Sequence, residues 1–287
     1  MNNINKIVIS FSGGRTSAYM TLWLLNSEKY KDYDKVIVFA NTGKERSETL
    51  DFVNQFEQHI NHRIFWLEAL VNPEKGQGTR HKIVGYNTAS RNGEPFEDVI
   101  KKYSIPNQNF IHCTRELKLA PIKSFLRSIG WKKGDYYEAI GIRADETRRI
   151  NWKQAEKDNK IYPLVTDIRI DSMFVRKFWD SMSFDLQLKD YEGNCDLCYK
   201  KSKRKLLTIL TENPNLINWW NDMEIKYGNE ELYFYRGNTS CIELLEQSTG
   251  KFTKAKDKFQ AFKDSPTLFE RFDYDLDGES SCTCGVD

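Results

Sequence analysis

The cysteines of this 287-residue chain are the residues whose spacing first suggests chemistry. They stand at positions 113, 195, 198, 241, 282 and 284. Cys195 and Cys198 form a C-x-x-C, which can place two thiolates around one metal ion or make a redox pair. Cys282 and Cys284 form a C-x-C near the carboxyl end. Cys241 has apolar neighbours and is expected to pack as a small buried side chain.

A second chemical feature is the glycine turn Ser12-Gly13-Gly14-Arg15-Thr16-Ser17. Such a turn between a strand and a helix can direct backbone N–H groups at an anion, and the helix dipole assists. It is neither a Walker A motif nor a G-x-G-x-x-G fingerprint. The alternative is a tight turn in which Ser12 or Thr16 caps the helix. Because open α/β sheets bind ligands at the carboxyl ends of their strands, we expect phosphate binding here.

Composition excludes some classes of protein. Lys and Arg number 43 against 41 Asp and Glu, a net charge of +2, so any basic binding site must be local. Mean hydropathy is −0.65, and no apolar run approaches the roughly 18 residues of a membrane span. The amino end lacks a signal-like apolar stretch, so we expect a cytoplasmic protein with no membrane partner. Cysteines in such a chain more often serve metal or redox chemistry than a disulfide framework.

The elements that must position these residues alternate between strands and helices. Strands are predicted over 6–11, 36–40, 64–67 and 136–142, with helices from 16, from 47 and over 114–129. This alternation predicts an α/β fold with a parallel sheet covered on both faces. Residues 72–110 interrupt it as a long insertion, which we expect to be functional or disordered. We therefore divide the chain into a nucleotide-binding domain, 1–168, and a mostly helical region, 169–287, with helices near 171–184, 199–211 and 215–226.

The glycine turn also resembles a known motif, the PP-loop (SGGxxS) of the adenine-nucleotide alpha-hydrolase superfamily. Four further segments narrow the resemblance to the phosphoadenosine-phosphosulfate (PAPS) reductase-like branch. They are FANTG at 39–43 with Glu48-Thr49, CTRELK at 113–118, GIRADE at 141–146 with Arg148-Arg149, and YPL at 162–164. The resemblance covers about residues 6 to 200. It implies a Rossmann-like core whose PP-loop grips the phosphate or sulfate end of an adenylated substrate.

The resemblance also implies a set of site residues. Those assigned to nucleotide or phosphate binding are Ser10, Ser12, Gly13, Gly14, Arg15, Thr16, Ser17, Asn41, Thr42, Gly43, Gly141, Arg148 and Arg149. Arg143 and Lys118 are assigned to catalysis, because guanidinium groups and ammonium groups suit phosphate and sulfate oxygens. The alternative for these cations is a solvated surface. Thr16 stands where ATP-consuming relatives commonly have Asp, so magnesium remains possible but less expected.

Adenylyl-sulfate reductases of this family hold a four-iron four-sulfur (4Fe-4S) cluster with a Cys-Cys pair and a distant C-x-x-C. Here the pair is His112-Cys113, which removes one ligand. The resemblance implies a cluster held by Cys113, Cys195 and Cys198, with zinc as the alternative metal, because soft thiolates suit both. Cys282 is assigned as the fourth ligand, and the other possible ligands are His112, Cys241, Cys284 or an external group.

The carboxyl end has a second interpretation. Cys284-Gly285-Val286 resembles the mobile E-C-G-x-H segment of phosphosulfate reductases, whose thiolate attacks the substrate sulfur before thioredoxin releases sulfite. Thr283 and Asp287 replace the flanking Glu and His. Cys284 is therefore assigned as the nucleophile, with ligand as its alternative role.

Three hypotheses of function follow from these features. The first is reduction of adenylyl sulfate (APS) or PAPS to sulfite with a thioredoxin-like dithiol donor. The second is an ATP-dependent adenylating sulfurtransferase that takes sulfur from a donor and thiolates tRNA, DNA or a small molecule. The 72–110 insertion and the cations at 200–205 favour it, since clustered charge can attract nucleic acid. The third is a non-catalytic, zinc-stapled nucleotide-binding module.

Overall fold

The computed structural model describes residues 4–74, 76–228, 233–257 and 259–260. Within them, six strands form one sheet in the spatial order β4-β3-β2-β1-β5-β6. The strands are β1 (Lys6–Ser10), β2 (Asp34–Asn41), β3 (Ile64–Leu70), β4 (Arg80–Val84), β5 (Tyr137–Ile140) and β6 (Lys160–Ile161). Neighbouring strands are parallel, except that β4 runs antiparallel to β3 at one edge. The predicted Rossmann-like α/β class is confirmed.

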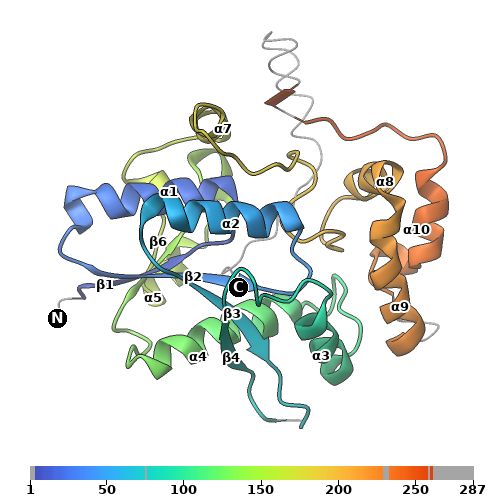
Figure 1. Ribbon diagram of the computed structural model, residues 1–287, viewed down its shortest axis with the longest axis horizontal. Coiled ribbons are helices and arrows are strands. Elements are labelled where there is room, and N and C mark those ends of the chain that lie inside the picture. Colours follow the sequence, from blue (N-terminus) through green and yellow to red (C-terminus); the bar gives the residue numbers. More distant parts are fainter. Residues whose placement is uncertain (1–3, 75, 229–232, 258, 261–287) are drawn as a thin grey trace.

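The order of the strands identifies the ligand-binding edge of the sheet. From β1 the chain proceeds to β2 and β3 on one side, and it later returns to add β5 and β6 on the other side of β1. Such a reversal is a switch point, where the loops at the carboxyl ends of two adjacent strands separate and leave room for a ligand. The glycine turn directly follows β1, so the fold positions it at this point (Figure 1).

Helices cover both faces of the sheet (Figure 1). Those on one face are α1 (Arg15–Asn26), α2 (Ser47–Ile60) and α7 (Ser172–Asp180), and α4 (Ala120–Ser128) covers the other. Alternate residues of β1 enter the two cores: Ile7 and Ile9 pack with the first set and Val8 packs with α4. This is the pattern of a strand buried on both faces.

Two segments differ from the sequence prediction. The 72–110 insertion contains β4 and the helix α3 (Glu94–Tyr103), which buries Phe96, Val99 and Ile100. These three apolar residues span little more than one helical turn, too short a pattern to stand out in the sequence. The helix predicted over 114–129 begins as a π-helix (η2, Thr114–Leu119) before α4. Such π segments are frequent at functional sites.

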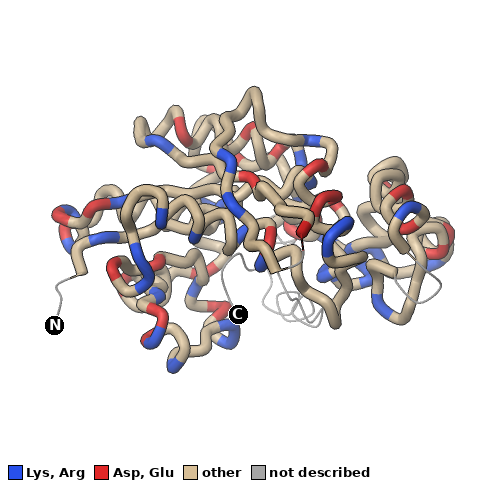
Figure 2. The backbone as a smooth tube through the Cα atoms, turned by 90° about the horizontal axis from the view of Figure 1, so that it is seen from below, with Lys and Arg blue, Asp and Glu red and all other residues tan. Residues whose placement is uncertain are grey.

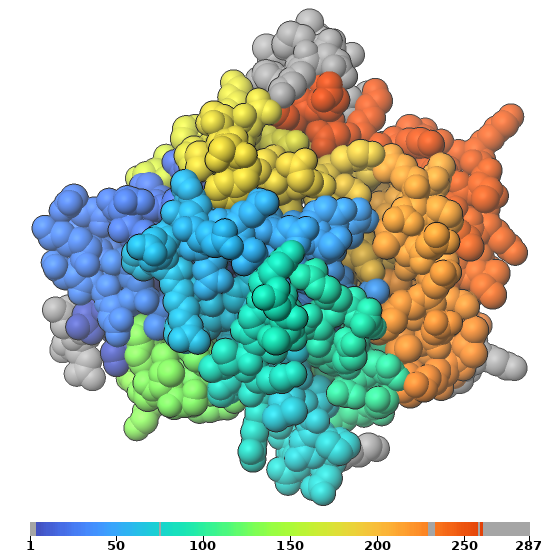
Figure 3. Space-filling view, in the orientation of Figure 1, coloured from blue at the N-terminus to red at the C-terminus, as the bar shows by residue number. Residues whose placement is uncertain are grey.

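The carboxyl-terminal helices build a second core beside the sheet. They are α8 (Lys203–Glu212), α9 (Ile217–Tyr227) and α10 (Cys241–Ser248). Trp220, Phe234 and Cys241 are fully buried there, which confirms the packing role predicted for Cys241. Phe96 and Val99 of α3 belong to the same core, and Figure 3 shows the α3 segment (green) seated between the sheet half and the orange helices.

Short helices connect the larger elements. They are η1 (Glu28–Tyr30), η3 (Ala144–Arg149), α5 (Trp152–Lys157), α6 (Pro163–Thr166), η4 (Pro214–Leu216) and η5 (Arg236–Asn238). Among the described residues, no helix has the length and apolar character needed to traverse a bilayer. Figure 2 shows Lys and Arg interspersed with Asp and Glu along both halves of the molecule, in keeping with the net charge of +2.

Candidate functional site

The glycine turn after β1 is held in shape by its own serine side chains. Ser17 Oγ accepts a hydrogen bond from the Ser12 amide at 3.1 Å, lies 2.9 Å from Ser12 Oγ, and donates to the Gly14 carbonyl at 3.0 Å. Gly14 is the N-cap of α1, which has no side-chain cap and no acidic residue in its first turn. The first N–H groups of a helix have no intrahelical acceptor and carry the positive end of its dipole. This loop therefore offers a positive helix end to an anion.

Two glycines allow the backbone to approach closely at this loop. Gly13 has a φ of +78°, and a Cβ added there would lie 2.8 Å from Thr49 Cγ2 and 3.0 Å from the Phe39 ring. Gly141 follows β5, and a Cβ there would lie 3.0 Å from Ser17 Cα. Both positions require glycine: the first for its left-handed backbone as well as for space, and the second for space alone. Gly141 thus lets the end of β5 pack against α1.

Arg143 brings a guanidinium group to the same loop. Its NH1 donates to Thr16 Oγ1 at 2.8 Å. Its Nε lies 3.1 Å from Asp145 Oδ1, and its NH2 lies 3.2 Å from Glu146 Oε2. These contacts orient the planar donor group beside the first turn of α1, where it can reach phosphate or sulfate oxygens. The structure therefore brings the predicted catalytic residue Arg143 to the PP-loop.

Arg15 has a different role from the phosphate ligand predicted for it. Its Nε and NH2 pair with both carboxylate oxygens of Asp185 at 2.6 and 2.9 Å. The guanidinium also donates to the carbonyls of Leu186 and Leu188, and Trp179 Nε1 donates to the Arg15 carbonyl. This bidentate pair and these two carbonyls use the side chain to anchor the segment after α7. Only the backbone N–H of Arg15 is left to serve an anion.

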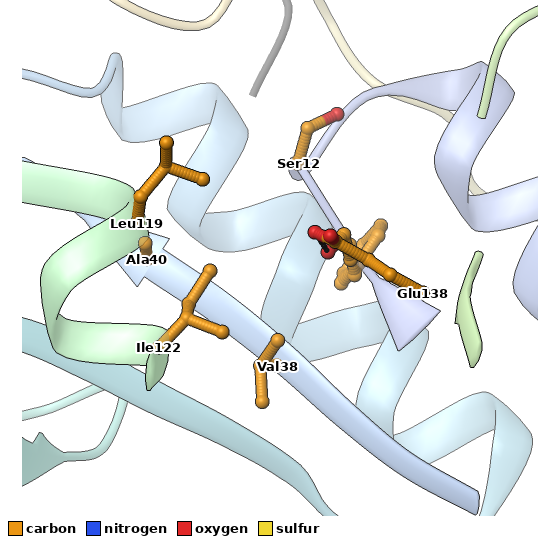
Figure 4. Close-up of a pocket in the computed structure, with 8 residues that line it drawn as sticks. Ser12, Val38, Ala40, Leu119, Ile122 and Glu138 are labelled. Carbon is orange, nitrogen blue, oxygen red and sulfur yellow. Dashed lines mark hydrogen bonds between the residues drawn. The ribbon is translucent and has the colours of Figure 1, made fainter. Parts of the chain in front are cut away.

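A small pocket opens beside the PP-loop at the switch point (Figure 4). It is lined by Ser10, Phe11, Ser12, Val38, Ala40, Leu119, Ile122 and Glu138 and is called the switch-point pocket below. Its walls come from β1, β2 and the helix that includes η2 and α4, and they are mostly apolar. Ser10 Oγ donates to Glu138 Oε1 at 3.0 Å. With a volume of about 10 Å³, it has room for about one water molecule.

The last residue of β2 and the residue after it face the protein interior. Asn41 is fully buried and donates from Nδ2 to Glu68 Oε1 on β3 at 2.7 Å. Its Oδ1 accepts from the Gly43 amide at 3.1 Å. Thr42 Oγ1 donates to Glu45 Oε1 at 3.1 Å. The side chains of Asn41 and Thr42, predicted to bind nucleotide, are therefore engaged in shaping the loop that follows β2.

That loop forms a dock for the segment that carries the C-x-x-C. Main-chain pairing joins the two: an antiparallel bridge between Glu45 and Cys195, and hydrogen bonds from Arg46 N to Asn194 O (2.7 Å) and from Asp196 N to Lys44 O (3.1 Å). We call residues 42–46 together with 192–201 the cysteine dock. It joins the helical region to the carboxyl edge of the sheet.

Ion pairs and caps reinforce the cysteine dock. Lys44 Nζ lies 2.9 Å from Asp196 Oδ2, and both side chains are largely buried. Asp196 Oδ1 also accepts from Trp220 Nε1 at 2.9 Å. Lys201 Nζ donates to the Cys195 and Asp196 carbonyls, and Ser202 caps α8. Lys201 of the cationic stretch 200–205 therefore faces the dock.

One side chain of the dock touches the PP-loop directly. Asn194 Nδ2 donates to the Ser12 carbonyl at 2.5 Å. The same amide group lies 3.6 Å from the position that a Cβ on Gly14 would occupy. The residue before Cys195 therefore contacts the anion-binding loop.

The described thiols lie in this region without forming a metal centre. Cys113 Sγ lies 3.0 Å from the Tyr199 hydroxyl, next to Cys198 in the sequence, and both Cys113 and Cys195 pack against the second core. Over the described ranges, no group of three or more His, Cys, Asp or Glu side chains is arranged to hold a metal ion. The predicted ligand Cys282 and nucleophile Cys284 lie outside the described residues. The expected cluster therefore stays a prediction.

The remaining predicted cations are placed differently from one another. Lys118 is buried on the π-helix, with Nζ 3.7 Å from Glu45 Oε1. Arg149 pairs with Glu146, the carboxylate that also holds Arg143. Arg148 is exposed. Lys118 therefore borders the cysteine dock, whereas Arg149 supports the Arg143 side.

Four residues at the site were not predicted. Glu138 could have been singled out from the sequence, because it lies inside the apolar run YYEAIGI. A carboxylate buried in such a run needs a compensating partner. No sequence feature marks Asn194, Lys44 or Asp196, since their partners are distant in the sequence and become neighbours only in the fold.

Comparison with known proteins agrees with this architecture. The phosphoadenosine phosphosulfate reductase domain family matches residues 6–167. Uncharacterized nin region protein ORF290 of Escherichia phage lambda is 30% identical, over 97% of this chain and 94% of that protein. Uncharacterized protein MJ0973 and Uncharacterized protein MJ0066 of Methanocaldococcus jannaschii are each 25% identical over 82% and 78% of this chain. The chain spans 51% and 42% of the lengths of these two archaeal proteins.

The family match covers more than half of the chain and includes the glycine turn, the loop after β2, β5 and η3. These segments follow or include strands of the sheet and carry the predicted site residues. Proteins of this family bind adenine nucleotides. The chain therefore belongs to the phosphoadenosine phosphosulfate reductase domain family.

Proposed function

We propose that this chain binds a phosphosulfate-carrying adenine nucleotide and reduces its sulfate group to sulfite. One observation carries the proposal: Asn194, the neighbour of Cys195, donates to the Ser12 carbonyl of the PP-loop at 2.5 Å. Reduction of a sulfate group carried by a nucleotide needs a thiol near the PP-loop. This contact supports such an arrangement for Cys195 and Cys198, because it joins their segment to the loop. The thiol that attacks sulfur is assigned separately to Cys284, by the resemblance of its segment to that of phosphosulfate reductases.

In this proposal the substrate lies across the switch point. The backbone N–H groups of the PP-loop and the start of α1 bind the phosphosulfate oxygens. Arg143, oriented by Thr16, Asp145 and Glu146, donates to the same group and stabilises charge on the departing phosphate.

The reaction proceeds by three displacements on sulfur. The thiolate assigned to Cys284 attacks the sulfate sulfur, the sulfur–oxygen bond to phosphate breaks, and the adenosine phosphate leaves with the electron pair. The product is a thiosulfonate on the cysteine. A thioredoxin-like dithiol then attacks the cysteine sulfur and releases sulfite, which leaves with the electron pair of the sulfur–sulfur bond. The second thiol of the dithiol then attacks the mixed disulfide and expels the Cys284 thiolate, so the dithiol is oxidised to a disulfide and the sulfate is reduced.

Sulfite release tests the proposal. The purified full chain, given adenylyl sulfate or its 3′-phosphorylated form and a reduced dithiol protein, is expected to release sulfite and adenosine phosphate in equal amounts. Cys284→Ser is expected to abolish release, whereas Cys241→Ser, at a buried position remote from the PP-loop, keeps most of it. Release by Cys284→Ser at the rate of the unmodified chain would contradict the assignment of the nucleophile. No release from either nucleotide would contradict the proposed reaction.

ATP-dependent thiolation is the second candidate. It is favoured by the cysteine dock, because the main-chain pairing fixes Cys195 near the PP-loop independently of the carboxyl end. Formation of AMP and pyrophosphate from ATP, only when bulk tRNA or DNA is present, would support this reaction in place of reduction. The reductase predicts no such turnover.

A further inference from the structure

The sheet ends at an edge strand that is paired on one side. β4 pairs with β3, and among the described residues no strand pairs with its other side. Figure 1 shows β4 at the edge of the sheet, next to α4. An edge strand presents a row of N–H and C=O groups that can pair with another extended segment. The question is which segment fits this edge.

The two faces of β4 differ in their chemistry. Arg80 and Lys82 point to one face, because side chains alternate along a strand, and both are exposed. His81 and Ile83 point to the other face, where His81 Nδ1 lies 2.9 Å from Ser124 Oγ of α4. Ile83 is 47% exposed, so α4 leaves an apolar side chain uncovered. A strand that fits beside β4 therefore carries anions on one face and apolar groups on the other.

One segment of this chain has that alternation. Residues 272–277 read Phe-Asp-Tyr-Asp-Leu-Asp, so that apolar or aromatic residues alternate with acidic ones. Such a period of two is the pattern of a strand with two unlike faces. The segment has three carboxylates and no Lys or Arg, which complements the cations of β4. It lies outside the described residues.

A second copy of β4 is a poorer partner for this edge. If two β4 strands paired antiparallel about Lys82, that residue would lie opposite its own copy, and like charges directly opposite each other are destabilising. Residues 272–277 avoid this repulsion and belong to the same chain, eleven residues beyond residue 260. A short tether gives an effective concentration of about 1 mM, so even a weak pairing is occupied.

We propose that residues 272–277 add to the sheet as a further strand, antiparallel to β4. In this register three pairs of residues lie directly opposite each other: Asp277 with Arg80, Asp275 with Lys82, and Tyr274 with Ile83. The two ion pairs lie on the exposed cationic face, and the tyrosine ring covers the uncovered isoleucine on the face of α4.

The direction of the added strand rests on the proposed function, whereas the pairing does not. Arg80 pairs with Leu70, the last residue of β3, and so marks the carboxyl edge of the sheet. An antiparallel strand brings Asp277 to this edge, which also carries the PP-loop. The seven residues from there to Cys284 can span about 24 Å. β1 is four strand spacings away, about 19 Å, so the thiol assigned as nucleophile can reach the PP-loop.

Residue-resolved backbone hydrogen exchange on the full chain tests the pairing without any nucleotide. We expect the outward amides of β4 to exchange about ten-fold or more slowly in the unmodified chain than in the triple variant Asp273→Lys/Asp275→Lys/Asp277→Lys. The matched control is Asp264→Lys/Glu270→Lys/Asp287→Lys, which changes three acidic residues outside the segment and is expected to keep the slow exchange. Equal exchange in the unmodified chain and the first triple variant overturns the pairing. Slow exchange that is lost on dilution overturns pairing within one chain, because it shows the segment of a second copy.

Charge swaps test the direction. Arg80→Glu is expected to speed exchange, and adding Asp277→Lys is expected to restore slow exchange, whereas adding Asp273→Lys is not. Rescue by Asp273→Lys instead overturns the antiparallel direction, and rescue by neither overturns the proposal. If Arg80→Glu does not fold, Lys82→Glu with and without Asp275→Lys repeats the test of pairing. A chain with protected β4 amides that releases no sulfite contradicts the proposed function alone, and sulfite release without this protection overturns the inference alone.

Discussion

The two sides of the carboxyl edge of the sheet differ in where their polar groups point. On the β1/β5 side, Arg143 lies beside the PP-loop at the start of α1, and Glu138 lines the switch-point pocket. On the β2 side, Asn41 and Lys44 are engaged with other protein groups. The first side is arranged to receive a ligand, and the second is arranged to hold the cysteine segment.

Residues of one family motif can therefore have different roles, some in ligand binding and some in packing. Asn41 and Thr42 belong to a segment that resembles a nucleotide-binding element, yet their side chains shape the cysteine dock. Through Asn194 the dock in turn supports the PP-loop. The β2 side therefore acts on the ligand indirectly, and variants on the two sides are expected to fail in different ways.

The largest effect is expected from breaking the buried pair of the dock. Asp196→Ala leaves Lys44 buried without its carboxylate partner at 2.9 Å and removes the acceptor of Trp220. Breaking a buried ion pair costs about 3–5 kcal/mol. Urea unfolding at neutral pH should show a loss of this size in the free energy of unfolding.

The control for Asp196→Ala is Glu28→Ala, whose pair with Lys31 is exposed. An exposed pair contributes less than about 1 kcal/mol. If both variants unfold at the same urea concentration, the dock is not the stabilising element described above.

The second-largest effect is expected from a substitution in the PP-loop, on the ligand side. Gly13→Ala places a Cβ 2.8 Å from Thr49 Cγ2 at a φ of +78°, so the loop must move. We expect a loss of about 3 kcal/mol in the free energy of unfolding and no measurable ATP binding. Gly14→Ala, one residue on, meets only ordinary contacts and should stay within about 1 kcal/mol of the unmodified chain. Equal behaviour of the two variants would refute the role given to Gly13.

Removing the contact between the two sides is expected to have a smaller effect, on ATP affinity. Asn194→Ala removes the donor to the Ser12 carbonyl at 2.5 Å. ATP affinity should fall about five-fold, since one neutral hydrogen bond contributes about 1 kcal/mol. Adenosine affinity should not change, because the PP-loop serves the phosphates. Exposed Asn92→Ala is the matched control, and an equal loss for adenosine and ATP would show that Asn194 acts elsewhere.

The smallest effect is expected from the hydrogen bonds between α3 and α9, far from the PP-loop in the sequence, and it depends on pH. Hydrogen bonds from Lys226 and Tyr227 lower the pKa of Glu97 below its ordinary value of 4.5. The stabilisation is therefore complete above pH 4.5 and is lost as the pH falls through the lowered pKa. Glu97→Gln should shift the urea midpoint downward at pH 7 and have less effect near pH 3. Glu156→Gln on α5 is the control, and a constant shift for Glu97→Gln at both pH values would contradict the stabilising role of these hydrogen bonds.

Much of the ligand side could be predicted from the sequence, because it is local. Within about twenty residues, a β-branched run predicts β1, two glycines predict the PP-loop turn, and helical spacing of apolar residues predicts α1. The cysteine dock could not be predicted, since Lys44 and Asp196 are distant in the chain. The partner of Arg15 was missed for the same reason: a cation beside a PP-loop suits phosphate as well as it suits Asp185.

We propose that ligand binds on the β1/β5 side and that the β2 side is a dock. Backbone hydrogen exchange with and without saturating ATP tests this directly. We expect new protection over residues 12–17 and 140–143, and little change over 41–46. Protection concentrated at 41–46, or no change at the PP-loop while ATP is bound, would contradict the account.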